Sequence, residues 1–101
     1  MPTEIHRYSF DPAIVFEDVE ASLLLAIFAA ESLHGESQVR LDAAHAVDAE
    51  QRSCVIDAST QVGRDINRVF IGFVLREFGP DSFHVERVDH LVARQPQEVH
   101  V

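Results

Sequence analysis

The sequence predicts a small α+β domain, in which helices cover an antiparallel sheet. Two observations lead to this fold class. Short segments alternate apolar and polar residues, which is typical of strands with one buried face. Two longer stretches carry apolar residues at helical spacing, and each stops at a glycine, Gly35 or Gly79.

The first strand and the first helix are neighbours in the chain. Residues 5–10 alternate, and Asp11-Pro12 ends that pattern. We expect the helix to begin at Asp18, because aspartate caps helices well, and to end at His34. Residues 23–30 contain no polar side chain, so this helix must be covered on nearly all sides, by its own fold or by another copy.

The middle of the chain predicts a hairpin and a second helix. Alternation over 39–47 and again over 53–58, with polar residues between them, indicates two paired strands. Ser59 or Thr60 then caps a helix that ends at Gly79-Pro80. A last strand follows over residues 83–88.

The resulting order is strand, helix, strand, strand, helix, strand. This is the split β-α-β-β-α-β order of ferredoxin-like folds, an antiparallel sheet with two helices on one face. We expect a single α+β domain over residues 1–93. Residues 94–101 are rich in polar residues and predict a flexible C-terminal tail.

Composition narrows the classes of function. The chain has 101 residues, a net charge of −9, and only arginines among its eight cations. This acidity argues against nucleic-acid or membrane-surface partners, which bind clustered positive charge. No apolar run reaches the roughly 18–20 residues of a membrane span. Cys54 is the only cysteine, as suits a reducing compartment, so we expect a cytoplasmic protein.

Apolar residues outside the expected core predict self-association. Ile71 and Leu75 lie roughly opposite the core side of the second helix, beside Gly72. Because the first helix also lacks a polar face, we expect a homo-oligomer, in the simplest case a dimer. The alternative is that these are scattered surface hydrophobes, which are common. The expected interface residues are Leu24, Ile27, Phe28, Ile71 and Leu75.

The start of the second helix is a candidate anion-binding site. Backbone N–H groups at a helix start attract anions, and Ser59, Thr60 and Arg64 are placed to add a hydroxyl and a positive charge. The simpler interpretation is that Ser59 or Thr60 only caps the helix. The chain has no lysine and no glycine-rich phosphate loop.

The same segment resembles part of another family. Asp57, Ser59 and Asp65 are similar to the segment after the third strand of anti-sigma-factor-antagonist (STAS) domains, with an acid and a serine at a strand end and a second acid eight positions on. The resemblance implies a regulatory module with a phospho-acceptor at Ser59 or Thr60. It departs at residues 66–68, which read Ile-Asn-Arg where the family places its phospho-acceptor serine and a glycine.

Histidines are the remaining candidates for chemistry. There are six, but no two are three or four residues apart, so we expect no metal site. A small enzyme with an active site on the open sheet face, near His45, His84 and Glu86, stays an alternative. No segment carries a catalytic motif, so the sequence favours a non-catalytic, self-associating interaction or regulatory domain without a cofactor. A different protein as partner stays open.

Overall fold

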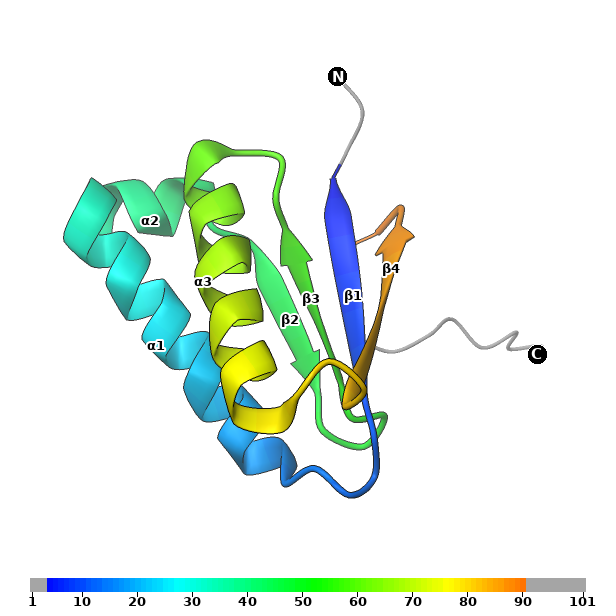
Figure 1. Ribbon diagram of the computed structural model, residues 1–101. Helices are drawn as coiled ribbons and strands as arrows, with labels where there is room; N and C mark the ends of the chain where they lie inside the picture. Colours follow the sequence, from blue (N-terminus) through cyan, green and yellow to red (C-terminus); the bar gives the residue numbers. More distant parts are fainter. Residues whose placement is uncertain (1–3, 91–101) are drawn as a thin grey trace.

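The computed structural model of the chain describes residues 4–90. Its strands and helices follow one another through the chain (Figure 1) as β1 (Ile5–Phe10), α1 (Phe16–His34), α2 (Glu36–Asp42), β2 (His45–Asp48), β3 (Ser53–Asp57), α3 (Gln61–Phe78) and β4 (Phe83–Val88). The tail expected over residues 94–101 lies outside the described residues, as do the two ends of the expected domain.

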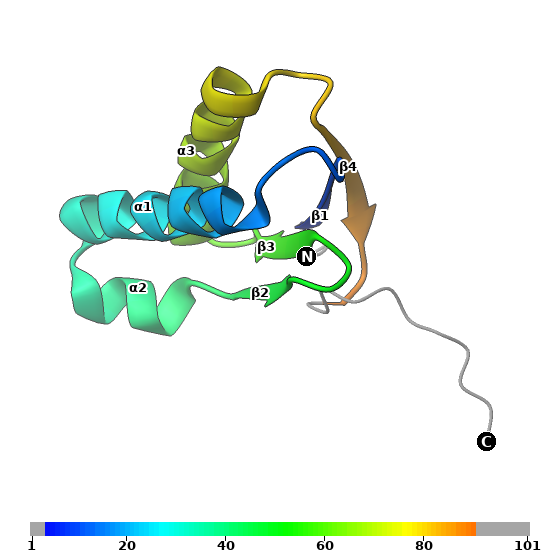
Figure 2. The same cartoon turned by 90° about the horizontal axis from the view of Figure 1, so that it is seen from below.

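The four strands form one antiparallel sheet in the order β2-β3-β1-β4. Strand β3 therefore lies between β1 and β2, and the described edges of the sheet are β2 and β4. The three helices gather on one side of the sheet, as Figure 2 shows. The predicted α+β class with an antiparallel sheet is confirmed, with three helices instead of the expected two.

The main core lies between the sheet and helices α1 and α3. Tyr8 and Phe10 of β1 point toward the helices, where the ring of Tyr8 meets that of Phe70 edge to face at 5.1 Å. Helix α3 adds fully buried side chains at helical spacing, as its sequence predicts. Those side chains are Val62, Ile66, Phe70 and Val74.

Helix α2 replaces part of a predicted strand. The alternation over 39–47 indicated a strand, but the structure has a helix to Asp42 and a strand only from His45. Two polar pairs favour the helix, because both join residues four apart, a spacing that brings side chains together on a helix surface. Arg40 lies 3.0 Å from Glu36, and Gln38 donates to Asp42 at 2.6 Å.

The helix ends follow the sequence more closely for α3 than for α1. Thr60 caps α3, and Gly79 ends it at a φ of 89°, as predicted. Helix α1 begins at Phe16, before the expected Asp18, and its N-cap Val15 provides no side-chain cap. Asp18 instead lies in the first turn, where a negative charge is favourable next to the unpaired N–H groups of the helix.

Candidate functional site

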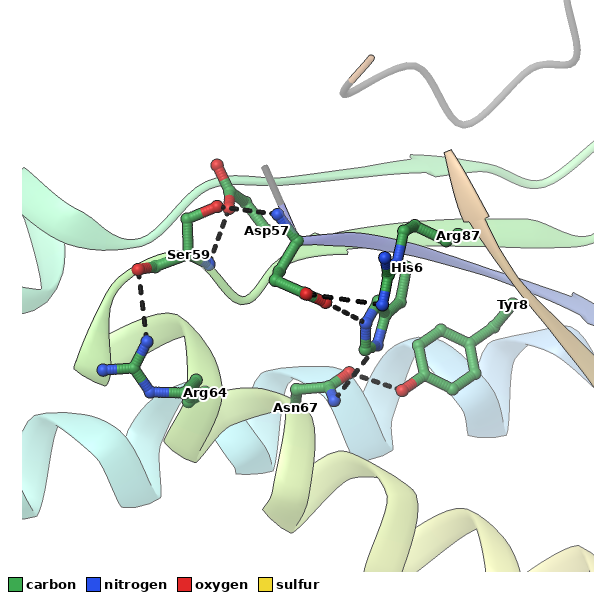
Figure 3. A network of polar contacts seen from close by, with 8 residues as sticks. His6, Tyr8, Asp57, Ser59, Arg64, Asn67 and Arg87 are labelled. Carbon is green, nitrogen blue, oxygen red and sulfur yellow. Dashed lines mark hydrogen bonds and ion pairs between the residues drawn. The ribbon is translucent and has the colours of Figure 1, made fainter. Parts of the chain in front are cut away.

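Two surfaces of the described chain combine features that a function could use. One is a polar network where β1, the end of β3 and α3 meet, drawn in Figure 3. The other is apolar and lies on α1 and the edge strand β2.

The polar network runs from the surface into the core. Glu4 and His6 approach through Oε2 and Nε2 at 3.3 Å, and Asn67 lies 3.4 Å from the Nδ1 atom of His6. Tyr8 donates its hydroxyl proton to the Oδ1 atom of Asn67 (Figure 3). That bond turns the amide NH₂ of Asn67 toward His6. The Nδ1 atom of His6 can then accept, and its Nε2–H can face the carboxylate of Glu4.

Burial fixes the protonation of Tyr8. Its side chain is inaccessible to solvent, and this burial raises the pKa of the phenol above its usual range, against a smaller opposite effect of the bond to Asn67. Tyr8 therefore stays a hydrogen-bond donor. Both ring nitrogens of His6 have partners in this network, so neither is free to act as a base without breaking an existing contact.

A hollow of about 310 Å³ opens beside this network. Its walls combine the polar atoms of Glu4, His6 and Asn67 with two arginines from the first half of α3, Arg64 and Arg68; the sixth lining residue is Ala58. Mixed charge of this kind can hold a small polar molecule. Among the described residues that line it there is no serine, threonine, tyrosine or cysteine, so this lining offers no hydroxyl or thiol nucleophile.

The expected anion site lies next to this hollow, and its residues are brought together. The Thr60 hydroxyl accepts from the N–H of Gly63 at 3.0 Å and donates to the carbonyl of Asp42 at 3.0 Å. Arg64 donates to the carbonyl of Ser59 at 3.2 Å. Thr60 thus acts as the cap that the simpler interpretation predicts.

Ser59 has partners on both its backbone and its side chain. Its N–H donates to the Asp57 carboxylate at 2.8 Å, and its hydroxyl accepts from the N–H of Glu4 at 3.1 Å (Figure 3). The carboxylate of Asp57 therefore occupies the N–H that an external anion would use. Anion binding by Ser59, Thr60 and Arg64 stays a prediction, and it requires displacing these internal contacts.

Gly63 positions this end of α3, a role that sequence reasoning missed. A Cβ atom at Gly63 would lie 1.9 Å from the carbonyl oxygen of Asp57, so only glycine lets the first turn of α3 pack against the end of β3. The one signal in the sequence is a glycine in the first turn of a helix, where glycine is otherwise unfavourable.

The three residues of the alternative active site, His45, His84 and Glu86, do not lie on the same face of the sheet. His45 lies opposite Ile56, whose side chain is in the core beneath the helices, so His45 is on the helix side of the sheet. His84 and Glu86 lie opposite Ser9 and Arg7, on the other side. Within residues 4–90, no group of three or more His, Cys, Asp or Glu side chains is placed to hold a metal ion.

The apolar surface begins on the outer side of α1. Leu24, Leu25 and Phe28 are 50%, 54% and 50% exposed, respectively, although each is large and apolar. The buried side of the same helix, which includes Val19, Leu23 and Ala26, is turned toward the core. Helix α1 is thus apolar on both sides, as its sequence predicts, and the structure leaves the outer one uncovered within the described chain.

A hollow of about 240 Å³ joins this surface to strand β2. Leu23, Leu24 and Ile27 line it from α1, and His45 and Val47 line it from β2; Glu20 completes the wall. Partial burial lowers the pKa of His45, so its imidazole is neutral near pH 7. Glu20 is then the charged residue of this lining, and the other described residues around the hollow are uncharged.

The five residues of the expected interface divide between two places. Leu24 and Ile27 lie in the hollow beside β2, and Phe28 follows Leu24 by one helical turn. Ile71 and Leu75 lie on α3. Leu75 is exposed, but Ile71 is partly buried and packs against the core, so its expected position opposite the core is wrong. Glu77 of α3 meets Ser22 of α1 at 3.5 Å. Leu24 lies two residues after Ser22, and Leu75 lies two residues before Glu77. Because a helix turns by about 200° over two residues, both leucines point away from this contact, on opposite flanks of the helical layer.

Comparisons with known proteins add no identification. No protein-family model matches the chain, and no significant match was found among curated proteins or solved structures. Among residues 4–90, no helix is long and apolar enough to cross a membrane.

Proposed function

We propose that this chain is a non-catalytic, self-associating interaction domain, and that two copies join through the outer side of α1. The observation that carries the proposal is the row of half-exposed Leu24, Leu25 and Phe28 on one helix. Large apolar side chains that share an exposed surface are typical of interaction sites, whereas single ones are common everywhere.

Burying this row in a dimer contributes a free energy of association that can be compared with the cost of bringing two copies together. Fully burying a Leu or Phe side chain is worth about 1.5–3 kcal/mol, so three half-exposed ones contribute roughly 2–4.5 kcal/mol per copy. A symmetric dimer doubles this to roughly 4.5–9 kcal/mol. The cost of association is on the order of 4–15 kcal/mol. The row alone therefore supports weak pairing, and a stable dimer needs adjoining contacts.

The charges on α1 favour a second copy that crosses it antiparallel. The polar residues near the start of α1 are acidic, among them Glu17 and Glu20, and a parallel pair would place these like charges together. An antiparallel pair centred between Leu24 and Leu25 instead places Glu17 near Ser32 of the second copy. Asp18 then lies near Glu31, which is the one like-charge pair of this register, whereas a parallel pair would place every acidic residue of α1 near its own copy. The antiparallel pair also brings the small Ala21 against Phe28, which suits close helix packing.

The experiment compares two chemically identical surface changes, Leu24→Asp and Leu75→Asp, with the unchanged chain. Both leucines are partly exposed, at 50% and 41%, so neither change should unfold the protein. Size-exclusion chromatography with light scattering should give twice the chain mass of 11.3 kDa for the unchanged chain and for Leu75→Asp. Leu24→Asp should give the single mass. An unchanged chain that stays monomeric at about 100 μM, well above a micromolar Kd, removes the proposal.

We also infer a ferredoxin-like relationship for the fold. The order of elements supports it once α2 is treated as an addition between α1 and β2. The position of β3 between β1 and β2, with antiparallel neighbours throughout, also supports a split β-α-β unit.

A further inference from the structure

The two described edges of the sheet differ in how they are protected. Edge strands expose unpaired N–H and C=O groups, and proteins commonly guard them with charged residues or proline. Strand β4 carries Glu86 and Arg87. Strand β2 reads His-Ala-Val-Asp, and its first three residues carry neither a charge at neutral pH nor a proline. Edge β2 is thus open to pairing with another strand.

The register of the hairpin shows which groups point outward. The N–H of Asp57 donates to the carbonyl of Ala44 at 2.9 Å. This bond shows which residues of β2 form hydrogen bonds with β3. In an antiparallel pair, every second residue bonds the same neighbour, so Ala46 also faces β3. The backbone N–H and C=O groups of His45 and Val47 therefore point away from the sheet.

We propose that β2 pairs antiparallel with β2 of a second copy, across a two-fold axis at Ala46, so that the two sheets become continuous. This inference rests on the proposed self-association and specifies its geometry. In this register, His45 of each copy lies opposite Val47 of the other, and all outward-pointing groups of both residues find partners. Pairing His45 with itself, or Val47 with itself, would place the next bonding positions outside the strand.

Interface size also favours including β2. A stable dimer covers about 800 Å² on each copy. The three half-exposed side chains of α1 supply roughly a third of that area. The hollow of about 240 Å³ makes β2 continuous with them, because Leu24 and Ile27 share its walls with His45 and Val47. A second copy that covers both α1 and β2 thus closes one continuous, mostly apolar surface, with Glu20 and His45 as its polar residues.

Disulfide trapping at Ala46 tests the register. Facing residues at a position without hydrogen bonds lie about 4.5 Å apart between Cα atoms, within the 4.4–6.8 Å range of disulfides. Ala46→Cys, in a Cys54→Ala background that removes the one native thiol, should form a covalent dimer under mild oxidation. Ala49→Cys is the matched control, because the same axis would hold its two copies roughly 20 Å apart. We expect at least tenfold more cross-linked dimer for Ala46→Cys than for Ala49→Cys.

Amide hydrogen exchange on the unmodified chain provides a second readout. The N–H groups of His45 and Val47 should become protected as concentration rises. Three outcomes contradict the inference. A dimer by light scattering with neither the cross-link nor this protection overturns the β2 pairing but leaves self-association through α1 intact. A strict monomer removes both proposals. Protection that develops only when an unrelated extended peptide is added shows that the edge takes a different partner.

Discussion

Replacing Gly63 by alanine tests how the start of α3 is positioned. The added Cβ would lie 1.9 Å from the carbonyl oxygen of Asp57, and an ordinary contact is at least 3.4 Å. The obstacle is backbone, so the first turn of α3 must move by more than about 1 Å and weaken the Thr60 cap. Overpacking costs about 1–3 kcal/mol and a lost cap about 1 kcal/mol. Together these predict a loss of about 2–4 kcal/mol in the free energy of unfolding.

The matched control is the same substitution nine residues further along the same helix. Nothing lies within 4 Å of a Cβ at Gly72, so Gly72→Ala should stabilise α3 by up to about 1 kcal/mol through helix propensity. In thermal unfolding followed by circular dichroism, we expect Gly63→Ala to lower Tm by roughly 10–20 °C and Gly72→Ala to raise it by a few degrees. A Gly63→Ala protein as stable as the unchanged chain would refute the close approach of α3 to β3.

Three further changes follow from buried or paired groups. Tyr8→Phe leaves the buried Oδ1 atom of Asn67 without its donor and should cost about 1–3 kcal/mol in urea unfolding; an unchanged midpoint would show that this bond contributes nothing. The hydrogen bond from His34, 2.7 Å away, lowers the pKa of Asp65, so the pair stabilises the fold above the ordinary carboxyl pKa, and its contribution disappears as pH falls through the lowered value. His34→Ala should therefore flatten the acid side of a plot of stability against pH, and an identical slope in both proteins would contradict this. Burial raises the pKa of the Cys54 thiol to about 12, so a thiol reagent at about pH 8 should label the chain only after unfolding; rapid labelling of the folded chain would mean that Cys54 is accessible.

The sequence predicts best those parts of the fold that local signals determine. The cap at Thr60 and the stop at Gly79 bound α3 as expected, because a hydroxyl cap and a glycine end act within one helical turn. The prediction of a strand in place of α2 is wrong because Val39 and Leu41 alternate with polar residues, a pattern that is also typical of strands. The pairs Glu36–Arg40 and Gln38–Asp42 reveal the helix only when side chains four apart are compared.

The candidate surfaces were predictable in part. The apolar run of α1 predicts that the side of the helix turned away from the core is apolar too. The structure agrees, because Leu24 and Phe28 lie on that side and are half exposed. The role of β2 depends on strand order, which sets which strand is an edge, and periodicity does not contain that order. The contact of Gly63 with the end of β3 and the bond from Tyr8 to Asn67 join residues far apart in sequence, so neither leaves a local pattern.

An isotope-mixing experiment tests the self-association most directly. Equal amounts of carbon-13-labelled and unlabelled chain are mixed, and a filtered nuclear Overhauser spectrum records only contacts between different copies. We expect signals from the methyl groups of Leu24 and Leu25 to the ring of Phe28 in the other copy. A spectrum with no such contacts, from a sample that tumbles as an 11.3 kDa particle, would contradict the proposed self-association.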